Sequence, residues 1–259
     1  MSKYLLAGSL CLSLIIPSAL LTSCRKKAKD PEPVVAAKTY GAITVKVSNE
    51  VDGSPVTFGA YSFTNAKGER YSINILKYYI SNFTLVGEDN TETNYHNYKL
   101  IDAKDTSTCR FTLDSIPNGN YKAIKFYIGV DSLNNHTGLQ EGDLDPIKQM
   151  IWGWKIGYIF FKHEGTFRND TGGSEILLYH LGTDEALSQA SITIPLITVK
   201  GNDHTLYLKF NLNDVYHKPN DVGFKRNNIH QSTDIFGDAG WLLDLRTNMP
   251  NAFTCSKVE

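Results

Sequence analysis

The sequence predicts an all-β protein: a single immunoglobulin-like β-sandwich or open barrel with long loops and a few short helical turns. Three observations favour this class. Short stretches rich in β-branched and aromatic residues recur along the chain, turn-forming residues separate them, and no long amphipathic segment has helical spacing. After an N-terminal leader, about 220 residues remain, which suits one domain of this kind.

The first residues of the chain are organised as a targeting signal. A basic residue, Lys3, precedes an apolar run that ends in Leu21-Thr22-Ser23-Cys24. This order defines a secretory signal peptide, and a Cys after Leu-Thr-Ser matches the bacterial lipobox. We therefore expect residues 1–23 to be a lipoprotein signal peptide and Cys24 to carry lipid. A transmembrane anchor is the alternative, and Pro17 argues against it.

The stretch after the lipid-bearing cysteine is charged, contains proline and lacks periodicity. We expect residues 24–38 to be a flexible tether to the membrane and residues 39–259 to form the β domain. The tether begins with Arg25, Lys26 and Lys27, where acidic residues would direct some lipoproteins to the cell surface. The predicted location is therefore the cell envelope, on the periplasmic face of the outer membrane.

Two patterns predict the strands of the domain. Ala42–Val47 alternates apolar and polar residues, as a half-buried strand does. Tyr71–Val86 is rich in Ile, Tyr and Phe, which is typical of a long or bent strand. The other predicted strands are Tyr98–Ile101, Arg110–Leu113, Tyr121–Val130, Ile156–Phe161, Glu175–Tyr179, Ser191–Val199 and His204–Asn211.

Turns and helices leave fewer signals than strands. Ile116-Pro117-Asn118-Gly119 predicts a tight turn between two strands. Asp145 before Pro146 is a typical N-cap and N1 pair, so we expect a short helical turn from Pro146 to Met150. Asn213 or Asp214 is expected to open another short turn.

Two long stretches, 131–154 and 217–238, interrupt the strand pattern. Long ordered loops in a compact β domain are usually functional. The first loop ends with Trp152 and Trp154, large side chains that are costly to leave in water. We therefore expect this loop to pack against the fold.

Charge and cysteine content restrict the classes of partner. The net charge is −1, with no basic stripe along the domain, so we expect no nucleic-acid partner. The domain holds two cysteines, Cys109 and Cys255. In an oxidising compartment they either form one disulfide or remain as buried or free thiols, and metal ligation is the least favoured of the three roles.

Metal-ligand spacing is absent from the sequence. No two of the seven histidines stand two or four residues apart, so a metal site would have to be assembled from separate segments. Asp131, Glu141, Asp143 and Asp145 could together hold calcium, but the spacing of an EF-hand loop is missing. Turn capping is the favoured role for these carboxylates, and calcium is not an expected cofactor.

Trp152-Gly153-Trp154 has three interpretations on composition alone: core packing, an aromatic platform for carbohydrate, or a neighbour of a redox metal. Packing is favoured. The motifs CxxC, CxxCH and HExxH are absent, and no nucleophile and base stand in a known arrangement. We therefore expect a binding protein rather than an enzyme, and a hydrolase or oxidase is the least favoured reading.

A Trp-x-Trp-x-x-Gly-Tyr pattern followed later by His-Leu-Gly is the most specific motif of the chain. It belongs to an ordered set of segments, Tyr71–Asn82, Ile116–Tyr121, Ile128–Ser132, Gly142–Pro146, Met150–Tyr158 and Tyr179–Gly182. In this order the segments together resemble the MbnP-like copper-binding proteins, a family associated with methanobactin genes.

The resemblance implies a secreted protein that holds copper with two histidines and an oxidised tryptophan, kynurenine. Carried over by position, the histidines are His136 and His180, and the tryptophan is Trp154 or, less favoured, Trp152. The resemblance also implies a partner oxidase, a di-haem enzyme of the bacterial cytochrome c peroxidase type. This chain departs from methanotroph members at Gly138, where they carry an acidic residue, and at 183–186, where they carry a cysteine.

The prediction is a lipid-anchored extracytoplasmic copper-binding protein with copper as its cofactor. Two neutral imidazoles suit copper, because imidazole nitrogen is one of its preferred ligands. The alternative is a β-sandwich lipoprotein that binds a non-metal ligand or mediates adhesion. In that alternative, Trp152 and Trp154 form an aromatic platform.

Overall fold

The computed structural model describes residues 39–153, 155–225, 230–232 and 239–259. The predicted signal peptide, the tether and Cys24 lie outside the described residues. The strands of this part of the chain are β1 Tyr40–Val51, β2 Ser54–Pro55, β3 Phe63–Thr64, β4 Arg70–Gly87, β5 Glu92–Asp102, β6 Arg110–Pro117, β7 Gly119–Ile128, β8 Ile151–Gly153, β9 Gly157–Arg168, β10 Ser174–Gly182, β11 Ser188–Val199, β12 His204–Asn211, β13 His230–Ser232 and β14 Phe253–Val258.

The helices are short. They are α1 Ser132–Asn135, α2 Leu212–Val215 and α3 Ala239–Asn248, with 3-10 turns η1 Thr106–Cys109, η2 Gly142–Leu144, η3 Pro146–Lys148, η4 Asp184–Ala186 and η5 Met249–Ala252. Within the described ranges, no helix has the length and apolar character that crossing a bilayer requires.

The larger sheet is organised around β4, a strand of 18 residues. Tyr78 pairs with both β5 and β9, and Ile80 pairs with both β5 and β7. The strands β9 and β7 therefore follow one another along one edge of β4, while β5 occupies the opposite edge. Asn82 interrupts the pairing with a φ of 49°, a conformation that Asn adopts more readily than most residues. This irregularity bends the long strand.

The smaller sheet runs in the order β14-β12-β1, and β6 and β2 pair with β1. The strands β1 and β12 are parallel, with Ile43 opposite His204. Burial alternates along β1, so that Ile43, Val45 and Val47 face inward. This is the face that meets the larger sheet.

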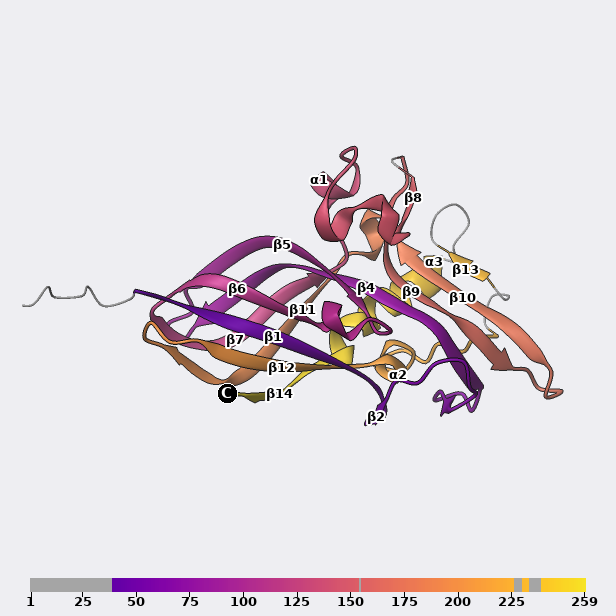
Figure 1. Cartoon of the computed structure of the whole chain (residues 1–259). Helices are drawn as coiled ribbons and strands as arrows, with labels where there is room; N and C mark the ends of the chain where they lie inside the picture. Colours follow the sequence, from indigo (N-terminus) through magenta and orange to yellow (C-terminus); the bar gives the residue numbers. More distant parts are fainter. Residues whose placement is uncertain (1–38, 154, 226–229, 233–238) are drawn as a thin grey trace, which may run out of the picture. The chain divides into compact units, whose positions relative to one another are not determined.

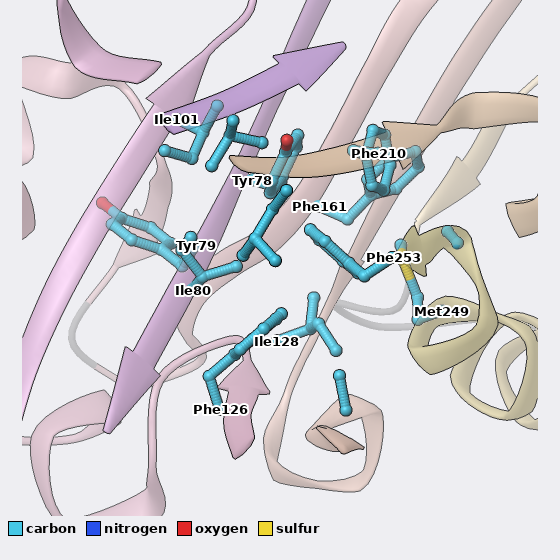
Figure 2. Packing of buried hydrophobic residues seen from close by; sticks show 14 of the residues in the cluster. Tyr78, Tyr79, Ile80, Ile101, Phe126, Ile128, Phe161, Phe210, Met249 and Phe253 are labelled. Carbon is cyan, nitrogen blue, oxygen red and sulfur yellow. The ribbon is translucent and has the colours of Figure 1, made fainter. Parts of the chain in front are cut away.

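Aromatic side chains from both sheets fill the space between them, as Figure 2 shows for one part of the core. The rings of Tyr78 in β4 and Phe210 in β12 have centroids 4.4 Å apart. Phe126 in β7 meets Phe253 at the start of β14, with centroids 5.1 Å apart. The described strands form two open sheets packed face to face, which confirms the predicted all-β class in its sandwich form.

The inner face of β9 and β10 packs against the segment that follows β12 rather than against the smaller sheet. Its inward side chains meet Tyr216, which follows α2, then Phe224, and Trp241 of α3. Tyr179 of β10 and Trp241 have ring centroids 5.2 Å apart. The segment after β12, which the sequence pattern left largely unassigned, therefore completes the core.

The predicted strands all occur in order, with β12 matching at both ends. The elements that were not predicted include β14, which closes the edge of the smaller sheet, and α3, together with several short strands and turns. The helical turn expected at Asn213 or Asp214 begins earlier, because Leu212 is the first residue of α2 and Asn211 is its N-cap. The Asp145 cap is confirmed, since its side chain accepts a hydrogen bond from the Ile147 amide.

The disulfide considered for the two cysteines of the domain is not formed. Both Cys109 and Cys255 are free thiols. Cys109 lies immediately before β6, on one side of β1, whereas Cys255 lies in β14, beyond β12 on the other side. Because neighbouring strands are spaced by about 4.8 Å, sulfurs three strands apart cannot bond.

Candidate functional site

The residues singled out by the sequence gather where β10 ends. Here α1, the hairpin of β8 and β9, and the turn η4 lie close together, and Figure 1 shows α1 and β8 beside one another at this end of the sheet. The loop 131–150 packs onto the fold as predicted. The hydroxyls of Tyr79 and Tyr158 donate to the backbone oxygens of Asp143 and Leu144, at 2.9 and 2.6 Å.

His136 forms the C-cap of α1 and is held by Asp184 of η4. Its Nε2 lies 3.2 Å from the Asp184 Oδ1, and both side chains are about two-fifths exposed, at 41% and 40%. Ser132 also donates to Asp184, at 2.5 Å. Burial would raise the pKa of Asp184, but these hydrogen bonds and the nearby imidazole hold it below its ordinary value. The carboxylate is therefore a stable acceptor for the imidazole.

Asn135 connects His136 to the sheet. The Asn135 side chain is 2% exposed, accepts from the Tyr158 amide at 2.7 Å and donates to Asp184 at 2.8 Å. Gly157 makes room for it, since a Cβ at that position would lie 2.3 Å from the Asn135 oxygen. One buried amide thus links α1, β9 and η4 and fixes the chain immediately before His136.

His180 lies on the outward face of β10 and is held by a carboxylate on the neighbouring strand. Its Nε2 is 2.9 Å from the Glu164 Oε1, and its side chain is 16% exposed. Lys162 is 3.2 Å from the same oxygen. Burial would raise the pKa of Glu164, and the His180 hydrogen bond and the Lys162 ammonium together lower it below its ordinary value.

Trp152 packs over the backbone of Gly182, two residues after His180. It is partly buried against the core, and its six-membered ring lies against the Cα of Gly182. Thr183 then turns the chain off β10 with a φ of 69°, leading to Asp184. Trp154, the slightly favoured candidate for oxidation, lies outside the described residues.

The two histidines come to one end of β10, but they remain in two separate pairs. Across the described residues, no group of three or more His, Cys, Asp or Glu side chains converges as a metal site does. His136 belongs with Asp184 and His180 with Glu164.

The remaining candidates have structural roles. Asp131 caps α1, as predicted, by accepting from the Asn134 amide, and Asp145 caps η3. His163 is fully buried on the opposite face of β9 from Glu164, with its Nδ1 2.7 Å from the Tyr216 hydroxyl. It does not belong to this group.

Sequence reasoning missed Asn135, Glu164 and Asp184. Asn135 and Asp184 stand beside residues that were examined, but an isolated Asn or Asp in a polar loop is usually a solvated or capping residue. For Glu164 a signal did exist. Lys162 and Glu164 follow the predicted strand Ile156–Phe161, and its alternation, continued by three residues, puts both side chains on one face. Antiparallel pairing with an equally extended strand of His180 would place all three side chains together.

The arrangement has the features of metal-binding histidines. A ligating imidazole almost always donates its second N–H to a carboxylate, a carbonyl or water, which fixes the ring orientation. His136 and His180 both hold a carboxylate at Nε2. Imidazole nitrogen and carboxylate oxygen are donors that copper and zinc accept. The residues present therefore fit a divalent or monovalent copper ion in chemical type.

Comparison with known proteins adds information on ancestry. The family model described as MbnP matches residues 40–233. Among solved structures, MbnP from Methylosinus trichosporium is similar, with a TM-score of 0.50 and 16% sequence identity, over 77% of this chain and 83% of that chain. At this identity the likeness concerns the fold. No curated protein matches the chain.

Proposed function

Because the chain belongs to the MbnP family, we propose that it is a lipid-anchored extracytoplasmic protein that binds copper through His136 and His180. The observation that carries this proposal is the pair of carboxylate-held imidazoles at the end of β10. The family resemblance implied both histidines as ligands, and the carboxylate contact of each ring supports this, because metal-ligating histidines usually make such a contact through their second nitrogen. The protein acts as a binder rather than as an enzyme.

Each residue at the site has a part in this function. His136 and His180 supply the imidazole nitrogens, while Asp184 and Glu164 orient the two rings. Copper, when bound, supplies a redox-active centre. Trp152 packs against Gly182, two residues after His180, which supports it as the indole that is oxidised to kynurenine, whose amine and ketone are additional donors. Trp154, which follows it closely in sequence, is the other candidate.

The remaining parts of the proposal concern the setting of the protein. Cys24 carries the lipid and holds the domain at the periplasmic face of the outer membrane. A di-haem oxidase of the cytochrome c peroxidase type supplies the oxidising power for the tryptophan. The exposed position of the α1 loop supports access by such a partner, since Leu133 and Leu139 are 76% and 83% exposed.

Copper titration of the domain tests the ligands. Wild type, His136→Ala and His180→Ala are titrated with copper in competition with a chelator of known affinity, and both variants are expected to bind more weakly. His96→Ala is the matched control, because His96 is exposed on β5, away from β10. If both site variants bind copper as tightly as wild type, the assignment of the ligands is wrong.

Intact-mass measurement of protein purified from its native envelope separates copper binding from the alternative function. Conversion of indole to kynurenine adds a small, defined mass, and peptide mapping assigns it to Trp152 or Trp154. The aromatic-platform function is favoured instead by two results together: the protein has the mass of the unmodified chain, and it binds a glycan that the Trp152→Ala variant no longer binds.

A further inference from the structure

A buried phenol and a buried imidazole form a hydrogen-bonded pair on the inward face of β9. The Tyr216 hydroxyl lies 2.7 Å from the His163 Nδ1, and the two side chains are 1% and 0% exposed. Neither residue takes part in the proposed copper site, which lies on the outward face of the same strand. The pair is therefore a feature of the core that the proposed function leaves unexplained.

The protonation state of the pair follows from its surroundings. Burial raises the pKa of Tyr216 well above its ordinary value and lowers the pKa of His163 to about 3, so both groups are neutral at pH 7. The phenol then donates its proton to Nδ1, and the imidazole carries its own proton on Nε2. That nitrogen is buried and has no hydrogen-bond partner in the part of the chain that the structure describes.

The other buried tyrosines have acceptors of a different kind. The hydroxyls of Tyr71 and Tyr78 donate to the side-chain oxygens of Asn213 and Asn49. Those of Tyr79, Tyr158 and Tyr179 donate to backbone carbonyls. Amide oxygens are very weak bases. Among the tyrosine hydrogen bonds given above, that of Tyr216 is the one made to an imidazole, which is a stronger base than an amide oxygen.

Tyr216 also lies at the centre of a cluster of oxidisable rings. Its centroid is 5.8 Å from that of Tyr179, which in turn is 5.2 Å from Trp241. On its other side, His163 is 5.7 Å from Tyr71. All of these rings are at most 1% exposed. Electron transfer between rings in contact is fast, so an electron removed from any member can be replaced from its neighbours.

We propose that Tyr216 and His163 form a proton-coupled redox pair, in which an oxidising equivalent delivered to the core comes to rest as a Tyr216 phenoxyl radical. A high-potential, metal-centred one-electron oxidant at the protein surface takes one electron from Tyr216. The phenolic proton moves along the existing hydrogen bond from Oη to Nδ1, leaving a neutral radical and an imidazolium. A one-electron reductant, a thiolate or a reduced metal centre, then supplies an electron to the radical, the proton moves back from Nδ1 to Oη, and the pair is restored.

The depressed basicity of His163 does not prevent this step. An oxidised phenol is a far stronger acid than the phenol itself, so even a weakly basic imidazole accepts its proton. The other tyrosines would have to pass their proton to an amide oxygen, which is much less favourable. The hydrogen bond therefore selects Tyr216 over its neighbours.

The position of the pair suits it to protect the proposed copper site from oxidative damage. Tyr179 and His180 are consecutive residues of β10, on opposite faces, so the aromatic cluster lies immediately beneath a proposed copper ligand. A core that stores and returns an oxidising equivalent protects side chains beside a redox centre from irreversible oxidation. The inference goes beyond copper binding and does not require it.

Photochemical oxidation tests the pair in the full chain without copper. A ruthenium(III) polypyridine generated by a laser flash oxidises the protein, the sample is frozen, and electron paramagnetic resonance records the radical. Wild type is expected to give a tyrosyl radical whose spectrum narrows in protein made with ring-deuterated tyrosine. Tyr216→Phe is expected to lose this signal, and Tyr71→Phe, the matched control from the same cluster, to retain it.

His163→Gln separates proton transfer from packing. Glutamine keeps a hydrogen-bond acceptor but has no basic nitrogen, so the Tyr216 radical is expected to be lost. If Tyr216→Phe keeps the wild-type spectrum and yield, or if wild type forms no tyrosyl radical, the proposal is overturned. Circular dichroism checks that each variant is folded.

A measurement on the wild-type protein tests the same proposal even if the variants do not fold. After exchange into D2O, electron–nuclear double resonance of the wild-type radical is expected to detect one strongly coupled deuteron at hydrogen-bond distance and the nitrogen of labelled histidine. If both couplings are absent, the proposal is wrong. Because copper is not involved, this outcome is independent of the titration that tests the ligands.

Discussion

The indole of Trp152 rests directly on the backbone of Gly182, two residues after His180. A Cβ at position 182 would lie 2.5 Å from a carbon of the six-membered ring and 2.5 Å from the Tyr158 carbonyl oxygen. Only glycine permits this approach. The glycine of the His-Leu-Gly segment therefore positions a tryptophan at the proposed site, and its absent side chain is the reason that β8 can lie over the end of β10.

Gly182→Ala is expected to push Trp152 away from β10. The added methyl group meets both a side chain and backbone, and overpacking of this kind costs about 1–3 kcal/mol. Urea unfolding monitored by tryptophan fluorescence measures the loss of stability and the change in the environment of the indole. Gly138→Ala is the matched control, since a Cβ there has nothing within 4 Å. Equal stability of both variants would contradict the packing described.

Removal of the Asn135 side chain is expected to release the α1 loop. Asn135→Ala leaves the buried Tyr158 amide without its acceptor, which costs about 1–3 kcal/mol. Hydrogen exchange measured by mass spectrometry should show faster exchange in residues 131–150 and at Tyr158. Thr137→Ala removes only exposed hydrogen bonds within the same loop and should leave the exchange pattern near that of wild type.

The carboxylates that hold the histidines are expected to control copper affinity. Glu164→Gln and Asp184→Asn replace a charged acceptor with a neutral amide. Changes to such orienting partners typically weaken metal binding by about 10–100-fold. Competition titration measures the change in copper affinity. Glu175→Gln, at the opposite end of β10, is the control. If Glu164→Gln and Asp184→Asn both bind copper as tightly as this control, the carboxylates do not act through the imidazoles.

His163 is expected to make the fold sensitive to acid. The unfolded chain protonates this residue below its ordinary pKa of 6.5, whereas the folded chain resists protonation until the pH approaches 3. The unfolded state therefore binds more protons in this window, and stability falls as the pH falls, by about 1.4 kcal/mol per pH unit. Chemical unfolding from pH 7 to pH 4 measures the slope, which should be shallower in His163→Gln. Parallel slopes would contradict the buried neutral imidazole.

The two thiols of the domain are expected to remain unlinked in the purified protein. Peptide mapping without reductant should recover the Cys109 and Cys255 peptides separately, and dithiothreitol should leave the unfolding midpoint unchanged. Burial raises the pKa of both thiols, so alkylation at pH 7 is expected to be slow. A linked pair of peptides would contradict the strand order β6-β1-β12-β14.

Local patterns predicted the strands because β-branched and aromatic residues occur where the sheets are buried. Tyr71–Val86 was expected as a strand and occupies almost all of β4. The same patterns could not predict β14, since Phe253–Val258 has little alternation and becomes a strand by pairing with β12. Tertiary pairing decides the state of such short segments.

The candidate site was predicted in part for a similar reason. The resemblance to a family selected His136 and His180, but the carboxylates that hold them come from other elements. The contact of His180 with Glu164 depends on the register of β10 against β9, and that of His136 with Asp184 depends on the turn at Thr183. Neither can be read from residue spacing alone.

The parallel pairing of β1 with β12 has a consequence for how this chain reaches its native state. Ile43 meets His204, 161 residues later, so the smaller sheet closes a very long loop. The chain loses the conformational entropy of closing this loop before the strand pair contributes any stability. Folds dominated by such non-local pairs therefore fold slowly. Until β12 arrives, the edge of β1 exposes unpaired N–H and C=O groups that other chains can match. This edge is therefore the place at which an incompletely folded molecule is most exposed to aggregation.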